Sequence, residues 1–219
     1  MSVFYWYSFI LYSYSEIGDF MYKLQKANIQ LQSKQYFWLL ILGGIAILGS
    51  LIYLFFLDSV NKKIVTDSIY AYFTYFKSGE YQAFSFFLNS LGNNLFFVIS
   101  IWILGISMIG IPIVFLLYII KYFLFGFSLF GIFQTFGIKG IFKAFIYVFP
   151  FKLLFILGLT VLTFHSLYFA FHLCSNLFHK KTYHLHQYMI RYSKLFLFFL
   201  ILAIIDSLWE AYLLPNFLF

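Results

Sequence analysis

The run YFWLLILGGIAILGSLIYLFF, residues Tyr36–Phe56, decides the fold class of this chain. It contains no charged residue and is bounded by Lys34 and Asp58. A helix needs about 20 consecutive apolar residues to cross a bilayer, so this run predicts a transmembrane helix. Small residues within it would let a second helix approach closely: Gly43, Gly44, Ala46, Gly49 and Ser50.

The composition of the whole chain agrees with a membrane location. Of 219 residues, 63% are hydrophobic and 10% are charged, whereas a soluble domain carries roughly a quarter charged residues. This composition excludes a water-soluble enzyme. The net charge of +7 is explained by contact with anionic lipid headgroups, so the lipid bilayer rather than nucleic acid is the expected partner. Cys174 is the only cysteine, so an intrachain disulfide cannot form.

Four further spans are predicted downstream, about residues 94–109, 112–133, 142–173 and 195–214. Proline breaks helices because it lacks a backbone donor and restricts the preceding residue. Gly110-Ile-Pro112 therefore separates the second span from the third, Pro150 interrupts the fourth, and Pro215 ends the fifth. One kinked helix with a re-entrant portion is the alternative for residues 94–133. These spans define a transmembrane domain, 36–219, after an aromatic and basic N-terminal segment, 1–35.

The region 57–92 leans hydrophilic and separates the first two spans. Within it, the stretch Ser68–Phe76 carries aromatic residues at helical spacing, which predicts an amphipathic helix at the membrane interface. Its aromatic residues are the candidate partner surface: Tyr70, Tyr72, Phe73, Tyr75 and Phe76. The predicted fold is thus all-α, a polytopic transmembrane helix bundle of about five spanning helices plus an amphipathic interfacial helix.

The distribution of Lys and Arg predicts the orientation, because cytoplasmic loops are enriched in these residues. The loop His172–Lys194 holds four basic residues and no acid, and the N-terminal segment carries three Lys. The balanced region 57–92 would then lie outside. Only Lys139 and Lys143 oppose this arrangement, so the N-terminus is predicted to be cytoplasmic and the C-terminus outside.

Four charged residues stand out inside the spans: Lys121, Lys152, Asp206 and Glu210. An unpaired charge at the bilayer centre costs roughly 2.5–3.5 kcal/mol on insertion scales. Asp206 and Glu210 are four residues apart and share a helix face, and both lysines fall at similar depths. The sequence therefore predicts Lys–carboxylate pairing and leaves the partners open. An ion pair that locks helix packing is favoured over a proton or ion relay, since a relay needs a chain of titratable groups along a polar path.

No catalytic, cofactor-binding or metal-binding residues are predicted, and no cofactor. The histidines of the basic loop, His179, His184 and His186, have no carboxylate near them in sequence, and neighbouring lysines repel a cation. The glycines and prolines are interpreted as a helix-break and packing motif: Gly105, Gly110, Pro112, Gly126 and Pro150.

The run Trp102-Ile-Leu-Gly-Ile-Ser-Met-Ile-Gly-Ile-Pro112, followed by Lys121 and Gly126-Phe127, resembles the stage II sporulation protein M family of Gram-positive bacteria. Further matches follow in the same order: Gly140, Val148-Phe-Pro150, and Glu210-Ala-Tyr212 before Pro215. The resemblance covers most of residues 36–219. The chain departs from the family at Phe151-Lys152, where the family tends to have Gln or His followed by Asn.

The resemblance implies a membrane scaffold without enzymatic activity. Its family member recruits two cell-wall hydrolases, stage II sporulation proteins D and P, to the septal membrane for cell-wall remodelling during engulfment. It therefore implies a multi-pass protein of the bacterial cell membrane, enriched at the septum. The alternative is a small transporter or permease partner that uses the intramembrane Lys/Asp/Glu cluster. The sequence leaves oligomerisation open.

Overall fold

The structure, a computed structural model, describes residues 34–218 apart from 77, 79, 80, 108, 149, 150 and 180–184. It divides into two units, residues 1–39 and 40–219. The described part of the first unit is the start of the first helix, residues 34–39. The architecture below concerns the second unit.

Helices account for nearly all of the described residues, and no strand occurs among them. In chain order the elements are α1 (Lys34–Phe56), α2 (Ser59–Tyr75), α3 (Ala83–Gly105), α4 (Gly110–Phe136), α5 (Ile138–Val148), α6 (Phe151–His179), α7 (Leu185–Leu208), the π-helix η1 (Trp209–Leu213) and α8 (Leu214–Leu218). Within the described part of the chain, five helices are long and apolar enough to cross a membrane: Lys34–Phe56, Ala83–Gly105, Gly110–Phe136, Phe151–Cys174 and Met189–Asn216. The predicted all-α transmembrane bundle is confirmed.

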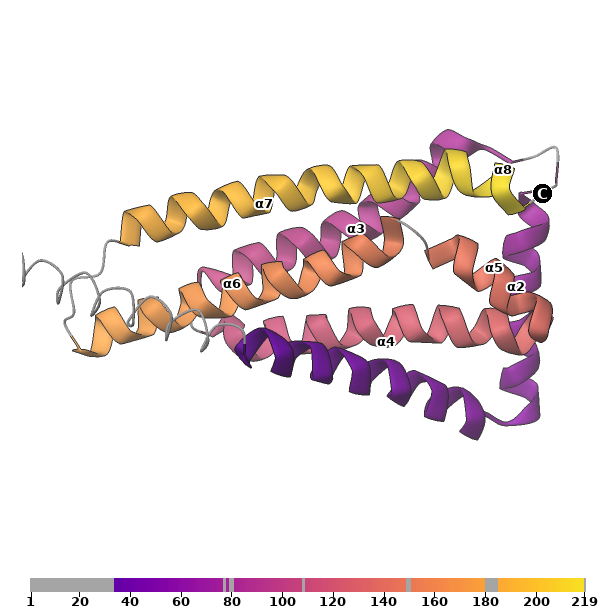
Figure 1. Cartoon of the computed structure of the whole chain (residues 1–219), viewed down its shortest axis with the longest axis horizontal. Coiled ribbons are helices and arrows are strands. Elements are labelled where there is room, and N and C mark those ends of the chain that lie inside the picture. The colour runs from indigo at the N-terminus through magenta and orange to yellow at the C-terminus, as the bar shows by residue number, and fades with distance from the viewer. Residues whose placement is uncertain are drawn as a thin grey trace, which may run out of the picture. The chain divides into compact units, whose positions relative to one another are not determined.

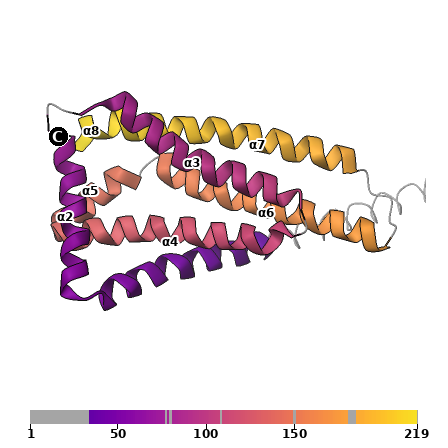
Figure 2. The same ribbon diagram turned by 180° about the vertical axis from the view of Figure 1, so that it is seen from behind.

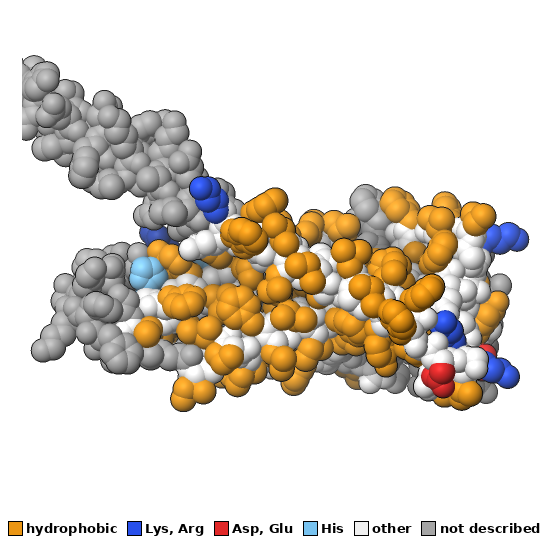
Figure 3. Space-filling model, turned by 90° about the horizontal axis from the view of Figure 1, so that it is seen from below, with side chains coloured by type: hydrophobic (Ala, Val, Ile, Leu, Met, Phe, Trp, Pro, Cys, Tyr) orange, Lys and Arg blue, Asp and Glu red, His pale blue; other side chains and the backbone are white. Residues whose placement is uncertain are grey.

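The spans α3, α4, α6 and α7 pack against one another, and α6 is the most buried of the five. Helix α2 runs across one end of this bundle instead of along it, as both ribbon views show (Figures 1 and 2). Helices α5 and α8 lie at the same end of the bundle, and we call it the α2 end. In the space-filling view, hydrophobic side chains cover the middle of the visible face, and acidic and basic side chains gather near the α2 end (Figure 3). This distribution suits helices that are surrounded by lipid along their length.

The second and third spans are separate helices, because α3 ends at Gly105 and α4 begins at Gly110. A Cβ on Gly110 would collide with the carbonyl oxygen of Leu104, so only glycine fits where the chain reverses. Pro112 lies in the first turn of α4, where a backbone N–H has no helical partner to lose. Helix α3 therefore ends at Gly105, before the predicted residue 109.

The predicted span 142–173 is wrong at its start, because two helices occupy this part of the chain. Helix α5 ends at Val148 and α6 begins at Phe151; Pro150 itself lies outside the described residues. Before α5, Gly137 has φ 60°, a left-handed conformation that glycine adopts without the cost of a Cβ. The short helix α5 therefore turns back from the end of α4 and precedes the true span.

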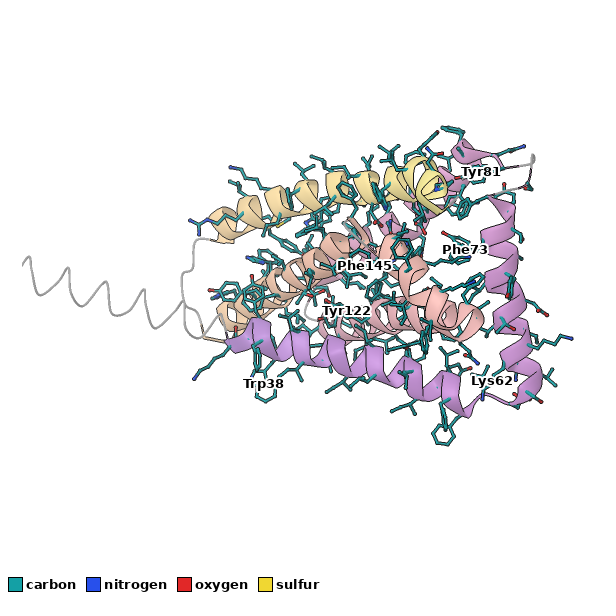
Figure 4. All side chains as sticks on the ribbon, turned by 45° about the vertical axis from the view of Figure 1, so that its right-hand side comes forward. Trp38, Lys62, Phe73, Tyr81, Tyr122 and Phe145 are labelled. Atoms are coloured by element: carbon teal, nitrogen blue, oxygen red, sulfur yellow. The ribbon has the colours of Figure 1, made fainter. Side chains whose placement is uncertain are left out.

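The second span also begins earlier than predicted. Helix α3 starts at Ala83, so Asn94 lies in the middle of the helix, where it is buried. Helix α2 is likewise longer than the predicted stretch 68–76, because it begins at Ser59. At the corner between α1 and α2, the Lys62 ammonium donates to the carbonyl of Phe55 at 3.1 Å and satisfies the end of α1 (Figure 4).

Helices α1 and α4 approach closely at a pair of small residues. A Cβ on Gly126 would collide with the hydroxyl of Ser50 and would lie 2.9 Å from the Cα of Ile47. Ser50 is fully buried, and its hydroxyl donates to the carbonyl of Ile47 at 2.6 Å. Of the small residues predicted to admit another helix, Gly43 and Ser50 therefore do so against α4, whereas a Cβ on Gly44 or Gly49 would meet nothing within 4 Å.

The last span does not end at Leu214, because a π-turn carries the helix past Pro215. Residues Trp209–Leu213 form the π-helix η1, and α8 follows it directly. Pro215 has no N–H to donate to the carbonyl four residues earlier, that of Ala211. The hydroxyl of Tyr81 donates to this Ala211 carbonyl instead, and so joins the α2–α3 connection to the end of the last span (Figure 4).

Candidate functional site: a buried charge cluster

The structure brings Lys152 and Glu210 into a direct ion pair. The Lys152 Nζ atom lies 2.9 Å from Glu210 Oε1, and the two side chains are 14% and 11% exposed. Lys152 lies in the first turn of α6, and Glu210 lies in η1. A buried ion pair of this kind needs further hydrogen bonds to offset the desolvation of both charges.

Glu210 receives these hydrogen bonds from two other helices. The Ser90 hydroxyl of α3 donates to Glu210 Oε2 at 2.6 Å, and the Tyr72 hydroxyl of α2 lies 3.4 Å from Oε1. Lys152 also lies 4.6 Å from the ring centroid of Tyr147 in α5, within cation–π range. Three helices thus reach the carboxylate through Tyr72, Ser90 and Lys152, and a fourth, α5, reaches the lysine through Tyr147.

The tyrosines at this pair are held in their neutral, hydrogen-donating form. Burial, followed by the nearby negative charge of Glu210, raises the pKa of Tyr72 well above its ordinary value. Burial likewise raises the pKa of Tyr147, and it raises the pKa of Tyr81 to about 12. These phenols therefore remain protonated over the physiological pH range.

Lys121 and Asp206 form the second half of the cluster, and an amide links them. The Asn94 Nδ2 atom donates to Asp206 Oδ2 at 2.9 Å, while Asn94 Oδ1 accepts from Lys121 Nζ at 3.2 Å. Asn94 Nδ2 also lies 3.2 Å from the hydroxyl of Ser207. Asp206 is fully buried, and Asn94 and Lys121 are 2% and 6% exposed.

Apart from Asn94, Lys121 has favourable contacts with aromatic rings, whereas one oxygen of Asp206 has no partner. The Lys121 Nζ atom lies 4.6 Å from the ring centroid of Phe97 and 5.5 Å from that of Phe155, so aromatic faces contribute to its stabilisation. Asp206 Oδ1 is buried and has no hydrogen-bond partner in the structure. The cation is therefore surrounded by favourable contacts, and the carboxylate is satisfied on one oxygen only.

Sequence reasoning missed the uncharged members of this cluster. Ser90 and Asn94 are four residues apart on α3 and point to Glu210 and Asp206 respectively. Their spacing matches that of Asp206 and Glu210, so two polar residues on one face of an apolar helix were the available signal. The predicted second span instead begins at Asn94, and a polar side chain at the boundary of a span needs no buried partner.

The candidate partner surface on α2 is largely internal, which corrects that prediction. Phe73 is 3% exposed and Phe76 is 9% exposed, and Tyr72 points toward Glu210. Phe73 lies on the side of α2 that faces the bundle (Figure 4), and its ring centroid is 5.1 Å from that of Phe136. Only Tyr70 and Tyr75, 49% and 37% exposed, remain accessible.

Among the described residues no group of three or more His, Cys, Asp or Glu could hold a metal ion. The glycines of the packing motif lie in close helix contacts. Besides Gly110 and Gly126, a Cβ on Gly105 would collide with the hydroxyls of Ser166 and Tyr192. The histidine loop lies partly outside the described residues, which omit 180–184.

The fold and this cluster define a polytopic all-α membrane protein with charged side chains buried among its spans. The chain belongs to the stage II sporulation protein M family, whose model matches residues 36–215. The predicted family resemblance is thereby confirmed. No curated protein and no solved structure gives a significant match to the chain.

Proposed function

We propose that this protein is a non-enzymatic membrane scaffold that recruits peptidoglycan hydrolases, of the stage II sporulation D and P type, to the cell membrane. The family match over residues 36–215 is the observation that carries the proposal. Septal enrichment and a role in cell-wall remodelling during engulfment belong to the same proposal. The N-terminus is cytoplasmic in this scheme, so the α2 end faces the cell wall, where hydrolases act.

The position of α2 supports the proposal, because this helix lies across the end of the bundle and presents one face outward. The outward face carries both apolar and charged side chains: Val60, Lys63, Ile64, Asp67 and Ala71 are exposed. A standard interface needs about 800 Å² from each partner. Helix α2 is the longest described helix outside the five spans and the largest candidate for such a surface.

The experiment is co-purification of hydrolases of this type with outward-face variants of α2. Replacing residues 66–78 with a Gly/Ser linker is unsuitable, because it would remove the buried Phe73 and the Tyr72–Glu210 contact. The variant Lys63→Glu/Asp67→Lys reverses two exposed charges and should abolish co-purification. It should leave the melting temperature in detergent unchanged.

The matched control reverses exposed charge elsewhere at the same end: Lys139→Glu, on α5. This variant should retain the hydrolases. Unchanged co-purification with the α2 variant would place the partner surface elsewhere. Absence of any hydrolase with the wild-type protein would overturn the scaffold proposal itself.

A further inference from the structure

The second half of the charge cluster leaves one strong acceptor without a partner. Asp206 is fully buried, Asn94 donates to its Oδ2 atom, and its Oδ1 atom accepts no hydrogen bond in the structure. An ionised carboxylate in a low-dielectric interior is costly unless both oxygens are hydrogen-bonded or paired. A proton on Oδ1 would remove the charge at the oxygen where compensation is missing.

The neighbouring cation does not supply this compensation. Lys121 is directed to the side-chain Oδ1 atom of Asn94 and to the rings of Phe97 and Phe155. No ion pair between Lys121 and Asp206 is formed in the described structure. Lys152, the other lysine of the cluster, is already paired with Glu210. The two carboxylates therefore differ: Glu210 is saturated by donors, and Asp206 is not.

The charged and titratable groups that act on Asp206 come from several helices. Lys121 of α4 and Lys152 of α6 bring positive charge to the cluster, and Glu210, one helical turn from Asp206, brings negative charge. Glu210 in turn contacts the hydroxyl of Tyr72 on α2, and Tyr147 of α5 lies beside Lys152. Opposing influences of this kind leave the protonation of Asp206 responsive to its surroundings.

A hollow approaches the Lys152–Glu210 pair from the α2 end. A hollow of about 200 Å³ lies between α2, α4 and α5, and its lining includes Tyr72 and Tyr147, the tyrosines beside the Lys152–Glu210 pair. Glu210 and Asp206 are one turn apart, about 6 Å along the helix. On the other side of Asn94, the next turns of α3 place Val98 and Ile101 in the interior, and both are fully buried.

We propose that Asp206 is a proton-binding site, loaded and unloaded from the α2 end by way of Glu210 and the hydroxyl of Tyr72. The proton binds at Oδ1, the carboxylate becomes a neutral carboxylic acid, and Asn94 holds Oδ2 in both forms. Lys121 remains the fixed cation of the site. This inference goes beyond the scaffold function and does not depend on it.

The test is pH-difference infrared spectroscopy of the full-length protein in lipid nanodiscs. To leave Asp206 as the only aspartate, the protein carries Asp19→Asn, Asp58→Asn and Asp67→Asn. This background should show a carboxylic acid C=O band that loses intensity as the pH rises. The band should shift when aspartate is ¹³C-labelled and stay in place when glutamate is labelled. It should disappear in Asp206→Asn and persist in Thr163→Val, which alters another fully buried side chain whose oxygen has no partner.

In this background the aspartate label reports Asp206 alone, so the assignment stands even if Asp206→Asn fails to fold. A spectrum with no pH-dependent acid band that shifts with the aspartate label would overturn the site. The route is tested by the rate at which the band shifts in D₂O. Tyr72→Phe should slow this exchange several-fold, whereas Tyr192→Phe, at a buried tyrosine bonded to the Ile101 and Trp102 carbonyls, should not. The reverse result would contradict entry from the α2 end.

Discussion

At the scale of single residues, the stability of this protein depends on how four buried charges are distributed among partners. Lys152 and Glu210 neutralise each other directly, and Asn94 joins Lys121 to Asp206. Breaking a buried pair by removing one member leaves an uncompensated charge, which typically costs about 3–5 kcal/mol. Replacing both members by apolar residues is often nearly neutral.

We therefore expect Lys152→Met and Glu210→Leu each to lower the detergent melting temperature, and the double variant to recover much of the loss. Thermal unfolding of the four proteins measures the coupling between the two sites. Lys63→Met, at an exposed lysine of α2, is the matched control and should change little. Additive losses in the cycle would mean that the ion pair contributes no coupling energy.

A second double-mutant cycle combines Lys121→Met with Glu210→Leu, two residues that form no direct ion pair in the structure. Lys121 makes its hydrogen bond to Asn94 rather than to Glu210, so the recovery in this double variant should be smaller than for Lys152 and Glu210. Thermal unfolding under the same conditions measures it. Equal recovery in both cycles would indicate that the four charges act as one unpaired group.

At the scale of helices, small residues set how closely the spans approach. The contact of α1 with α4 depends on Gly126, because a Cβ there would collide with Ser50 and press on the backbone at Ile47. Overpacking a close contact typically costs about 1–3 kcal/mol. Gly126→Ala should destabilise the protein by this order, as measured by thermal unfolding in detergent.

Gly49→Ala is the matched control for this substitution. Gly49 lies on the same helix as Ser50, and a Cβ at Gly49 would meet nothing within 4 Å. Alanine is favoured over glycine in a helix by about 1 kcal/mol, so this variant should be neutral or slightly stabilising. Equal losses at both positions would mean that the close approach of α1 and α4 is not what Gly126 provides.

Helix α2 is attached to the bundle by its aromatic face, and this attachment can be released. Phe73→Ala removes a side chain that is 3% exposed, a change that typically costs about 3–5 kcal/mol in a packed core. We expect this variant to expose α2 to limited proteolysis while the spans stay inserted. Tyr75→Ala, at a 37% exposed ring, should leave the cleavage rate near that of the wild type, and a rate as high as that of Phe73→Ala would argue against a specific attachment.

At the scale of the whole molecule, the expected orientation follows from the basic loop and the five spans. Five crossings would place the α2 end and the basic segment between α6 and α7 on opposite sides of the membrane. Alkaline phosphatase is active only outside the cytoplasm, so a fusion at Lys181 should be inactive and one in residues 57–92 active. Enzyme activity normalised to fusion abundance measures this, and the reverse pattern would invert the topology.

Much of the fold could be predicted from sequence because its determinants are local. An apolar run such as Tyr36–Phe56 must be a helix in lipid, since every backbone polar group has to be satisfied within the segment. The cost of burying charge also singled out Lys121, Lys152, Asp206 and Glu210 before any contact was known. The boundaries near Pro112 and Pro215 were less accurate, because proline in a first turn or after a π-turn does not end a helix.

Only the tertiary structure decided which side chains meet, because those contacts join residues far apart in the chain. Lys152 could have paired with either acid, and the rotation of α6 against η1 selects Glu210. The aromatic spacing in α2 indicates a helix with two faces, but not that Phe73 faces the bundle. Asn94 reads as an ordinary polar residue until α3, α4 and α7 are packed together. Local propensity and the lipid environment thus determine the helices, whereas helix packing determines the chemistry between them.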